Sequence, residues 1–326
     1  MDEARMLERS LVPVSLVTGA SGFLGRPLLD ALLGPDESRG RVVTVGRRRP
    51  PDWPAESFIQ ADLTNPESVR AAIEEAAPSI VFHLAGKTPP APAPELYKAN
   101  SMATALLLDA LRERGRPVRV ILTGSAAELG PVDESDLPVG EGHPCRPVTP
   151  YGVSKWLATC AGLAAQPPLE VMIARIFNPI GPGTPESQSL GRFAAQFSDP
   201  AVEELSVGCL DTRRDFVDVR DVARALIALA QHGRPGLVYH VGTGRSQRVG
   251  DGLEQLHRLS GGRVRVTIDP VHAGSAGPGD SRADIRRIVE QTGWRPEIPW
   301  EASVEDLWNE VQARPSVAID RVNTWT

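Results

Sequence analysis

The stretch Val17-Thr18-Gly19-Ala20-Ser21-Gly22-Phe23-Leu24-Gly25 follows an apolar run, Val12–Val17, and precedes a helical pattern, Arg26–Leu33. Glycine at every third position lets the backbone turn tightly and approach a ligand. The helix that follows presents unpaired N–H groups and the positive end of its dipole. A strand, a glycine turn and a helix in this order predict a pyrophosphate site. The spacing differs from the commoner G-x-G-x-x-G and also fits an ordinary glycine turn.

Length and composition restrict the class of protein. The 326 residues allow one large α/β domain with a smaller lobe, or two modest domains. A net charge of −6 gives no sign of a nucleic-acid or anionic-membrane surface. No apolar run reaches about 18 residues, so we expect no membrane span, and the charged Met1–Ser10 segment is unlike a secretion signal. The scattered cysteines Cys145, Cys160 and Cys209 predict no metal site, no disulfide framework and a cytoplasmic location.

The second predicted strand, Arg41–Val45, indicates which cofactor the turn would hold. It ends at Gly46-Arg47-Arg48-Arg49, roughly 20 residues beyond Gly25, where an NAD-binding unit has an acidic residue for the ribose 2′-hydroxyl. Arginines at this place accommodate a 2′-phosphate instead, so the sequence favours NADPH over NADH. The alternative is that these arginines form a solvated basic turn.

Further segments alternate between strand and helix patterns. The other expected strands are Ser57–Gln60, Ser79–Leu84, Val118–Leu122, Leu237–Val241 and Val264–Ile268. The other expected helices are Asn65–Ala76, Glu95–Arg114, Tyr151–Ala165, Gly191–Asp199, Val219–Gln231, Val249–Leu259, Arg282–Gln291 and Glu301–Ala313. We therefore predict an α/β protein with a Rossmann-type doubly wound parallel sheet and a smaller C-terminal α/β substrate-binding lobe. The nucleotide-binding domain would comprise residues 10–175 and 212–243, and the lobe residues 176–211 and 244–326.

Three polar or aromatic features have ordinary structural interpretations. His83 lies inside an apolar run and is expected to be a packed core histidine. Asp62 could cap a loop, although in this context we favour a contact to adenine. Phe193 and Phe197 lie one helical turn apart and are expected in the core rather than stacked on a base.

The segment Tyr151-Gly152-Val153-Ser154-Lys155 opens a predicted helix and carries chemistry. Tyr151 and Lys155 stand on the same helix face, so the ammonium can lie near the phenol. A nearby cation favours phenolate and lowers the tyrosine pKa, which would make Tyr151 a proton donor or acceptor. Alone, this spacing is weak evidence. Together with Ser125 after the Val118–Leu122 strand and with the glycine turn, it becomes strong.

These motifs together resemble the extended short-chain dehydrogenase/reductase family, in its sugar-nucleotide branch. The resemblance runs through nearly the whole chain and rests on Thr18–Gly25, Asp62-Leu63, His83–Gly86, Asn100, Ser125, Tyr151–Lys155, Arg175–Gly183, Arg214–Val222 and Thr292–Pro296. The pattern is most similar to reductases of nucleotide-linked 4-keto-6-deoxyhexoses, with the 4,6-dehydratases as cousins.

The resemblance implies roles for individual residues. Tyr151 would donate a proton to a sugar carbonyl while NADPH delivers hydride, Lys155 would hold the nicotinamide ribose, and Ser125 would hydrogen-bond the carbonyl oxygen. The implied cofactor-binding residues are Gly19, Ser21, Gly22, Phe23, Leu24, Gly25, Arg47, Arg48, Asp62, Leu63, Leu84, Ala85, Gly86, Asn100, Thr123, Tyr151, Lys155 and Ile176. The implied substrate-binding residues are Lys87, Ser125, Ala126, Asn178, Arg192 and Arg214. Asn100 fits a structural helix asparagine almost equally well.

Departures from the pattern are also informative. The dehydratases carry an Asp-Glu pair directly after the catalytic hydroxyl residue, and this chain has Ala126 and Ala127 there. Alanine is neither acid nor base, so a 4,6-dehydratase of that kind is not expected, and Glu128 would aim elsewhere. Leu129 stands where an aromatic residue is common, and a substrate arginine has no clear match around Val271–Gly279, with His272 the nearest candidate.

The leading interpretation is NADPH-dependent reduction of a dTDP- or GDP-linked 4-keto-6-deoxyhexose to the 4-hydroxy sugar. The alternative is an NAD-dependent nucleotide-sugar 4-epimerase, which would use the same three residues. A non-catalytic NADP-binding protein is disfavoured because Tyr151 and Lys155 are both present. Relatives form dimers through two long helices, and stripes at Leu107, Leu111, Trp156 and Cys160 allow a homodimer, although each would serve equally in packing onto the sheet.

Overall fold

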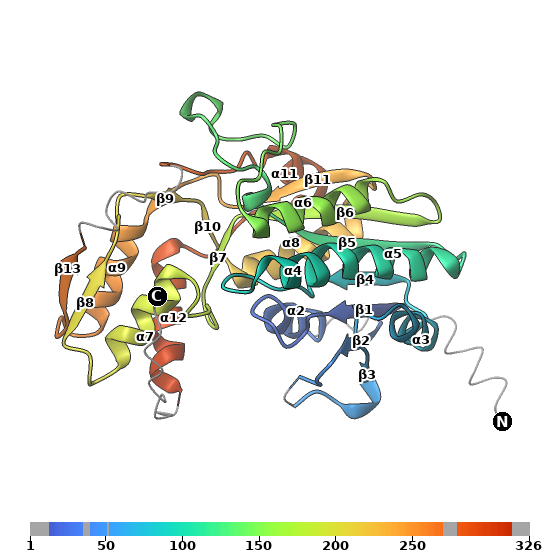
Figure 1. Cartoon of the computed structure of the whole chain (residues 1–326), viewed down its shortest axis with the longest axis horizontal. Coiled ribbons are helices and arrows are strands. Elements are labelled where there is room, and N and C mark those ends of the chain that lie inside the picture. Colours follow the sequence, from blue (N-terminus) through green and yellow to red (C-terminus); the bar gives the residue numbers. More distant parts are fainter. Residues whose placement is uncertain (1–12, 35–39, 51, 270–278, 315–326) are drawn as a thin grey trace.

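A parallel sheet of seven strands forms the centre of the computed structural model, which describes residues 13–34, 40–50, 52–269 and 279–314. Its strand order is β11-β6-β5-β4-β1-β2-β3. Figure 1 shows helices on both faces of this sheet and a smaller lobe at one end of it. The predicted Rossmann-type doubly wound architecture is therefore confirmed.

The elements of the sheet follow the predicted order, with one strand that the sequence patterns did not predict. The strands are β1 (Val14–Thr18), β2 (Arg41–Gly46), β3 (Phe58–Gln60), β4 (Ile80–His83), β5 (Val118–Ser125), β6 (Leu169–Ile176) and β11 (Leu237–Val241). The helices packed on them are α2 (Gly25–Leu32), α3 (Pro66–Ala76), α4 (Ala93–Leu96), α5 (Ala103–Glu113), α6 (Pro150–Leu163), α8 (Val219–His232) and α11 (Arg286–Thr292). The unpredicted strand is β6, which pairs with β5 over its whole length.

Alternate residues of each central strand enter two separate cores, because successive side chains of a strand point to opposite faces. Phe82 and Ile121 join a core with α2 and α8. Their neighbours Val81 and Val120 join a second core with α3 and α5. Burial on both faces explains why these strands read as continuous apolar runs rather than as alternating patterns.

The smaller lobe has its own core. Its elements are β7 (Asn178–Ile180), α7 (Ser189–Ser198), β8 (Glu204–Val207), β9 (Arg213–Arg214), β10 (Phe216–Asp218), β12 (Gln247–Arg248), α9 (Val249–Leu259), β13 (Arg265–Ile268) and α12 (Trp300–Ala313). Phe193 and Phe197 are buried in this core, as expected. Ile288 and Trp294, by contrast, pack into the core beneath α2 and α8. The domain division by residue number stays a prediction.

The long helix expected over Glu95–Arg114 is interrupted. A π-helical turn, η3 (Tyr97–Met102), separates α4 from α5. Leu107 and Leu111 on α5 are fully buried against the sheet, so they do not provide a surface for a second subunit. Exposed apolar side chains nearby are instead Met102 on η3 and Leu157 and Leu163 on α6.

Two sequence-based expectations concern residues outside the described ranges: the start of the first strand at Val12, and the substrate-side candidate His272. Within the described ranges, no helix is both long and apolar enough to cross a membrane.

Candidate active site

The glycine turn lies at the switch point of the sheet, between β1 and β4, where the order in which successive strands are added changes direction. Backbone hydrogen bonds from Gly22 N to Gly19 O at 2.9 Å and from Gly25 N to Gly22 O at 3.0 Å shape it. Gly19 has a φ of +70°, and a Cβ atom there would lie 2.6 Å from Ala85 N, on the loop after β4. At Gly25, a Cβ atom would lie 2.4 Å from Gly19 O. The turn thus brings bare backbone to the carboxyl ends of two strands.

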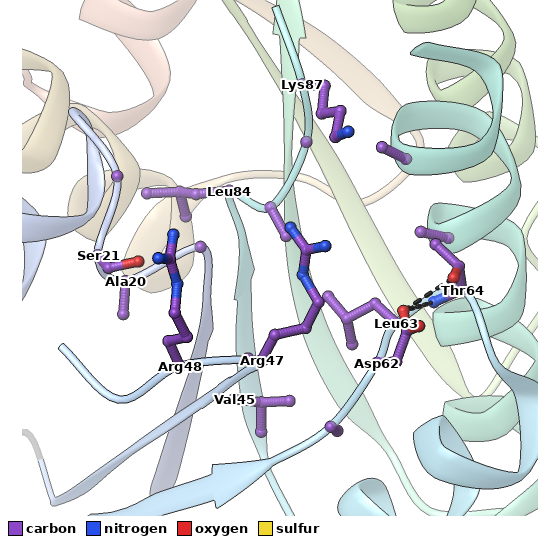
Figure 2. Close-up of a pocket in the computed structure, with 18 of the residues that line it drawn as sticks. Ala20, Ser21, Val45, Arg47, Arg48, Asp62, Leu63, Thr64, Leu84 and Lys87 are labelled. Carbon is purple, nitrogen blue, oxygen red and sulfur yellow. Dashed lines mark hydrogen bonds between the residues drawn. The ribbon is translucent and has the colours of Figure 1, made fainter. Parts of the chain in front are cut away.

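A first cavity, of about 490 Å³, opens beside this turn. Of the predicted cofactor residues, those that line it are Gly19, Ser21, Gly22, Arg47, Arg48, Asp62, Leu63, Leu84, Ala85 and Gly86. Figure 2 shows the Arg48 side chain extending from the end of β2 toward Ser21 and Leu84, with the Arg47 side chain beside it in the same cavity. No acidic residue stands at this end of β2. The cavity can therefore accept an anion beside a nucleotide.

The first cavity is also lined by charged side chains other than the arginines, among them Asp62 and Lys98. Asp62 Oδ1 accepts hydrogen bonds from Thr64 N at 2.9 Å and from the Thr64 hydroxyl at 2.8 Å. These bonds, together with the nearby cations Lys98 and Arg47, lower the pKa of Asp62. One oxygen of Asp62 thus serves as a loop cap, while the residue still lines the cavity. Lys98, which the sequence analysis did not single out, lines it as well.

A second cavity, of about 870 Å³, continues from the glycine turn toward the smaller lobe. It contains all three predicted catalytic residues. The predicted residues that line it are Gly19, Gly22, Phe23, Leu24, Gly25, Leu84, Gly86, Lys87, Asn100, Thr123, Ser125, Ala126, Tyr151, Lys155, Ile176, Asn178 and Arg214. A substrate in this cavity would touch both lobes.

Local structure explains how Ser125 and Tyr151 meet. Ser125 ends β5, and the short helix η4 (Ala126–Glu128) follows it. Helix α6 begins at Pro150, and its N-cap Thr149 accepts a hydrogen bond from Gly152 N at 3.0 Å. A Cβ atom at Gly152 would lie 2.4 Å from Ala127 O, so glycine lets α6 pack directly on η4. Tyr151, beside this contact, is thereby held close to Ser125.

The ionisation of the site differs from the sequence-based expectation. Burial raises the pKa of Tyr151, and a hydrogen bond with Ser125 opposes this effect only in part. Burial also lowers the pKa of Lys155, a change that the Glu128 carboxylate opposes. The expected net lowering of the Tyr151 pKa is therefore wrong for this structure, because loss of hydration outweighs the other effects.

Asn100 and His83 support the site from behind. Asn100 is buried: its Oδ1 accepts from Lys87 N at 2.8 Å, and its Nδ2 donates to Ser154 Oγ at 2.8 Å. The side-chain amide of Asn100 thus makes structural hydrogen bonds, and the residue also lines the second cavity. His83 is a core residue, as predicted, and burial lowers its pKa to about 3.

The position after Ser125 separates this chain from the dehydratase pattern. Ala126 and Ala127 line the second cavity, where their methyl groups offer no acid or base. Glu128, one residue further, has a fully buried side chain and is not among the cavity residues. Its carboxylate pairs with Arg175 instead. The expectation that Glu128 aims elsewhere is confirmed.

The substrate end of the second cavity includes Asn178 and Arg214, as predicted. Asn178 Nδ2 donates to Asp215 O at 3.1 Å, which ties β7 to β10. Burial lowers the pKa of the Arg214 guanidinium, and Asp280, which also lines the cavity, opposes that effect. Arg192 lies elsewhere: it is exposed on α7, with its guanidinium carbon 5.8 Å from the centre of the Phe193 ring, and lines neither cavity.

Lys98 and Asp280 carry no local sequence signal that would have revealed them. Lys98 is one charged residue on a helix, and only the packing of η3 over the strand ends brings it to the first cavity. Asp280 reaches the second cavity because Arg213 N and Asp215 N bond to the backbone of Gly279 and Ser281. Both placements depend on contacts between distant segments.

The fold and site geometry agree with the comparisons to known proteins. The chain belongs to the NAD dependent epimerase/dehydratase family, whose model matches residues 15–242. It is 32% identical, over 91% of its length and 97% of the relative's, to GDP-6-deoxy-D-mannose reductase of Pseudomonas aeruginosa. It is 29% identical to dTDP-6-deoxy-L-talose 4-dehydrogenase (NAD(P)(+)) of Kitasatospora kifunensis, with 92% of this chain and 96% of that one covered.

A solved structure is similar over the same extent. The structure of RMD from Pseudomonas aeruginosa complexed with NADPH superposes with a TM-score of 0.81 and 30% identity. The superposition covers 94% of this chain and 99% of that one.

The contact of Gly19 with the loop after β4 leads to a prediction. Gly19→Ala should weaken NADPH binding by at least tenfold, because its methyl group would meet backbone that cannot rotate away. Gly115→Ala is the matched control: its φ is +64°, but nothing lies within 4 Å of the added atom. The control should lose only about 1 kcal/mol of stability. Fluorescence titration of NADPH and urea unfolding measure both effects, and equal NADPH affinity in the two variants would contradict the prediction.

Proposed function

We propose that this protein is an NADPH-dependent reductase that converts the 4-keto group of a dTDP- or GDP-linked 4-keto-6-deoxyhexose to a hydroxyl. The observation that carries the proposal is that Ser125, Tyr151 and Lys155 line one cavity. In the same cavity, Ala126 and Ala127 stand where the dehydratases have their Asp-Glu pair. The similarity to a GDP-sugar reductase and to a dTDP-sugar 4-dehydrogenase supports the same reaction class.

The residues present fit a dinucleotide with a 2′-phosphate. Bare backbone at Gly19 and Gly22 and the start of α2 suit a pyrophosphate. Arg47 and Arg48, after β2, suit the extra phosphate, and Lys98 on η3 adds a further cation to the same cavity. When bound, the reduced nicotinamide supplies the hydride that reduces a carbonyl.

The chain's own groups supply the proton and hold the substrate. The raised pKa of Tyr151 keeps its phenol protonated at neutral pH, as a proton donor to a nascent alkoxide requires. The Ser125 hydroxyl would donate a hydrogen bond to the same oxygen. Lys155, buried one helical turn further, compensates the negative charge that proton loss leaves on Tyr151. Arg214 is suited to the diphosphate of the substrate.

The reductase is tested with purified protein, NADPH and each 4-keto-6-deoxyhexose nucleotide, by following loss of the reduced cofactor. We expect one NADPH to be oxidised per sugar with at least one of the two nucleotides. Tyr151→Phe should lower kcat by about 10²- to 10⁴-fold, whereas Tyr97→Phe, outside both cavities, should retain it. Absence of oxidation with either nucleotide would refute the proposal, and C4 epimerisation without net NADPH use would indicate the epimerase.

Cofactor preference forms a separate prediction. Arg47→Ala, Arg48→Ala and Lys98→Ala should each weaken NADPH by about tenfold while leaving NADH little changed, since each removes a charge-assisted contact. Arg49→Ala is the matched control, because its Nη1 donates to Trp53 O at 2.8 Å and the residue lines neither cavity. Equilibrium binding of both cofactors decides the matter. An equal loss of NADPH and NADH affinity in the three variants would show that these cations do not read the 2′-phosphate.

We also propose that the protein is a homodimer and that it is cytoplasmic. Its three cysteines are not in disulfide bonds, as is usual in the reducing cytosol. We expect the exposed apolar side chains Met102 on η3 and Leu157 and Leu163 on α6, which are 56%, 48% and 38% exposed, to contribute to the dimer contact. Leu157→Glu should therefore yield a monomer by light scattering at micromolar concentration. Leu259→Glu, at a 37% exposed leucine on α9, should leave the dimer intact. A wild-type monomer at that concentration would contradict this arrangement.

A further inference from the structure

A buried ion pair lies directly beneath the site. Glu128 Oε2 accepts a hydrogen bond from Arg175 Nε at 3.0 Å and lies 3.0 Å from Arg175 Nη2, and the two side chains are 0% and 1% exposed. Removing two charges from water is costly, and such a pair adds little to stability compared with apolar residues of similar size. A role other than stability would explain its presence at this place.

The Glu128 carboxylate joins three elements that carry the site. Its Oε1 accepts from Ser125 N at 2.7 Å, at the end of β5. Its Oε2 also accepts from the Thr159 hydroxyl at 3.1 Å, on the helix that carries Tyr151 and Lys155. A Cβ atom at residue 124 would lie 2.6 Å from Oε1, so Gly124 makes room for this approach. The carboxylate therefore connects the backbone of Ser125 to α6 and β6.

The far side of Arg175 is also held. Its Nη1 lies 3.3 Å from His240 Nε2, and its Nη2 donates to Cys145 Sγ at 3.2 Å. His240 Nδ1 lies 3.1 Å from Val139 O, a bond that requires the proton on Nδ1 and leaves Nε2 to accept from Arg175. With its partners fixed on both sides, the guanidinium is a rigid support for Glu128.

We propose that Glu128, held by Arg175, is a positioning residue that fixes Ser125 in place and sets the electrostatic balance of Tyr151 and Lys155. This inference rests on the proposed reductase function. An acid one position earlier would face the cavity, as Ala127 does, whereas Glu128 acts from beneath through its neighbours.

Replacement by glutamine separates shape from charge. The carboxylate accepts hydrogen bonds on both oxygens, whereas the amide of Gln has one acceptor and one donor group. In Glu128→Gln, either Ser125 N or Arg175 must therefore lose its acceptor. Glu128→Asp keeps the charge but is one methylene shorter, so it cannot reach both partners.

The negative charge of Glu128 affects the pKa values of the catalytic groups. The carboxylate raises the pKa of Tyr151 and of Lys155. Glu128→Gln should therefore lower the pKa of Tyr151. Besides Glu128, the titratable and charged groups on α6 and on the elements packed against it are Lys155 and Cys160 on α6, Glu95 on α4, Tyr97 and Lys98 on η3, Asp109, Arg112 and Glu113 on α5, Arg119 on β5, and Glu170 and Arg175 on β6.

Phenol titration of the protein without cofactor tests the charge effect independently of turnover. The chain has three tyrosines, and the ultraviolet difference between each protein and its Tyr151→Phe counterpart isolates Tyr151. Glu128→Gln should shift this titration to lower pH, while Glu128→Asp should leave it near the wild-type value. An unchanged titration in Glu128→Gln would overturn the electrostatic part of the proposal, even if wild-type protein reduces neither nucleotide sugar.

Turnover tests the positioning part. Glu128→Gln and Glu128→Asp should each lower kcat by about 10²-fold with KM little changed. In a Ser125→Ala background, Glu128→Asp should have little further effect, because it keeps the charge and so acts on turnover through Ser125 alone. Glu170→Gln is the matched control: its ion pair with Arg119, at 2.9 Å, joins the same two strands at their other end.

The outcomes are decisive in each case. A loss in kcat from Glu128→Asp that adds to that of Ser125→Ala, or a Glu128→Gln enzyme with wild-type kcat, would overturn the proposal. If Glu128→Gln fails to fold, as shown by thermal unfolding, Glu128→Asp alone decides the positioning claim by the same double-variant comparison. Wild-type inactivity toward every 4-keto sugar would instead refute the reductase, while the Tyr151 titration would still test the role of Glu128.

Discussion

A chain of buried hydrogen bonds connects the glycine turn to the helix that carries the catalytic tyrosine and lysine. Thr18 Oγ1 lies 2.8 Å from His83 Nδ1, and His83 Nε2 lies 3.0 Å from Thr104 Oγ1. Thr104 donates to Asn100 O at 2.6 Å, and Asn100 donates to Ser154 beside Lys155. Because the Thr104 proton is used in that bond, His83 must donate from Nε2 and accept at Nδ1. A neutral histidine therefore holds the two halves of the site together.

This series of hydrogen bonds explains three other features of the site. The low pKa of His83 keeps the ring neutral, as its two bonds require. The π-helical turn at Tyr97–Met102 places Asn100 where it can reach both Lys87 and Ser154. The close packing at Gly19 then brings the turn against the loop after β4. The cofactor cavity and the catalytic residues are thus parts of one rigid arrangement.

Much of this fold could be predicted from local patterns, and the exceptions have physical causes. Strands such as β2 and β11 are apolar and β-branched, so the expected and observed bounds nearly coincide. Strand β6 was not predicted, because it contains Glu170 and Arg175, whose charges are paired with distant partners. Strand β8 depends on β13, with which it pairs from some sixty residues away along the chain. Motif spacing was enough to predict the catalytic set of Ser125, Tyr151 and Lys155. The roles of Lys98 and Glu128 could not be predicted in this way, because they arise only from tertiary contacts.

Reduction of a sugar ketone in this site requires that hydride pass from the cofactor to C4 of the sugar. The most direct measurement is the fate of deuterium from NADPH that carries deuterium at both positions of the nicotinamide C4, followed in the sugar product by nuclear magnetic resonance. We expect one deuterium at C4 of the 6-deoxyhexose for each NADPH consumed. A C4 epimer without deuterium, or label at another carbon of the sugar, would contradict this expectation.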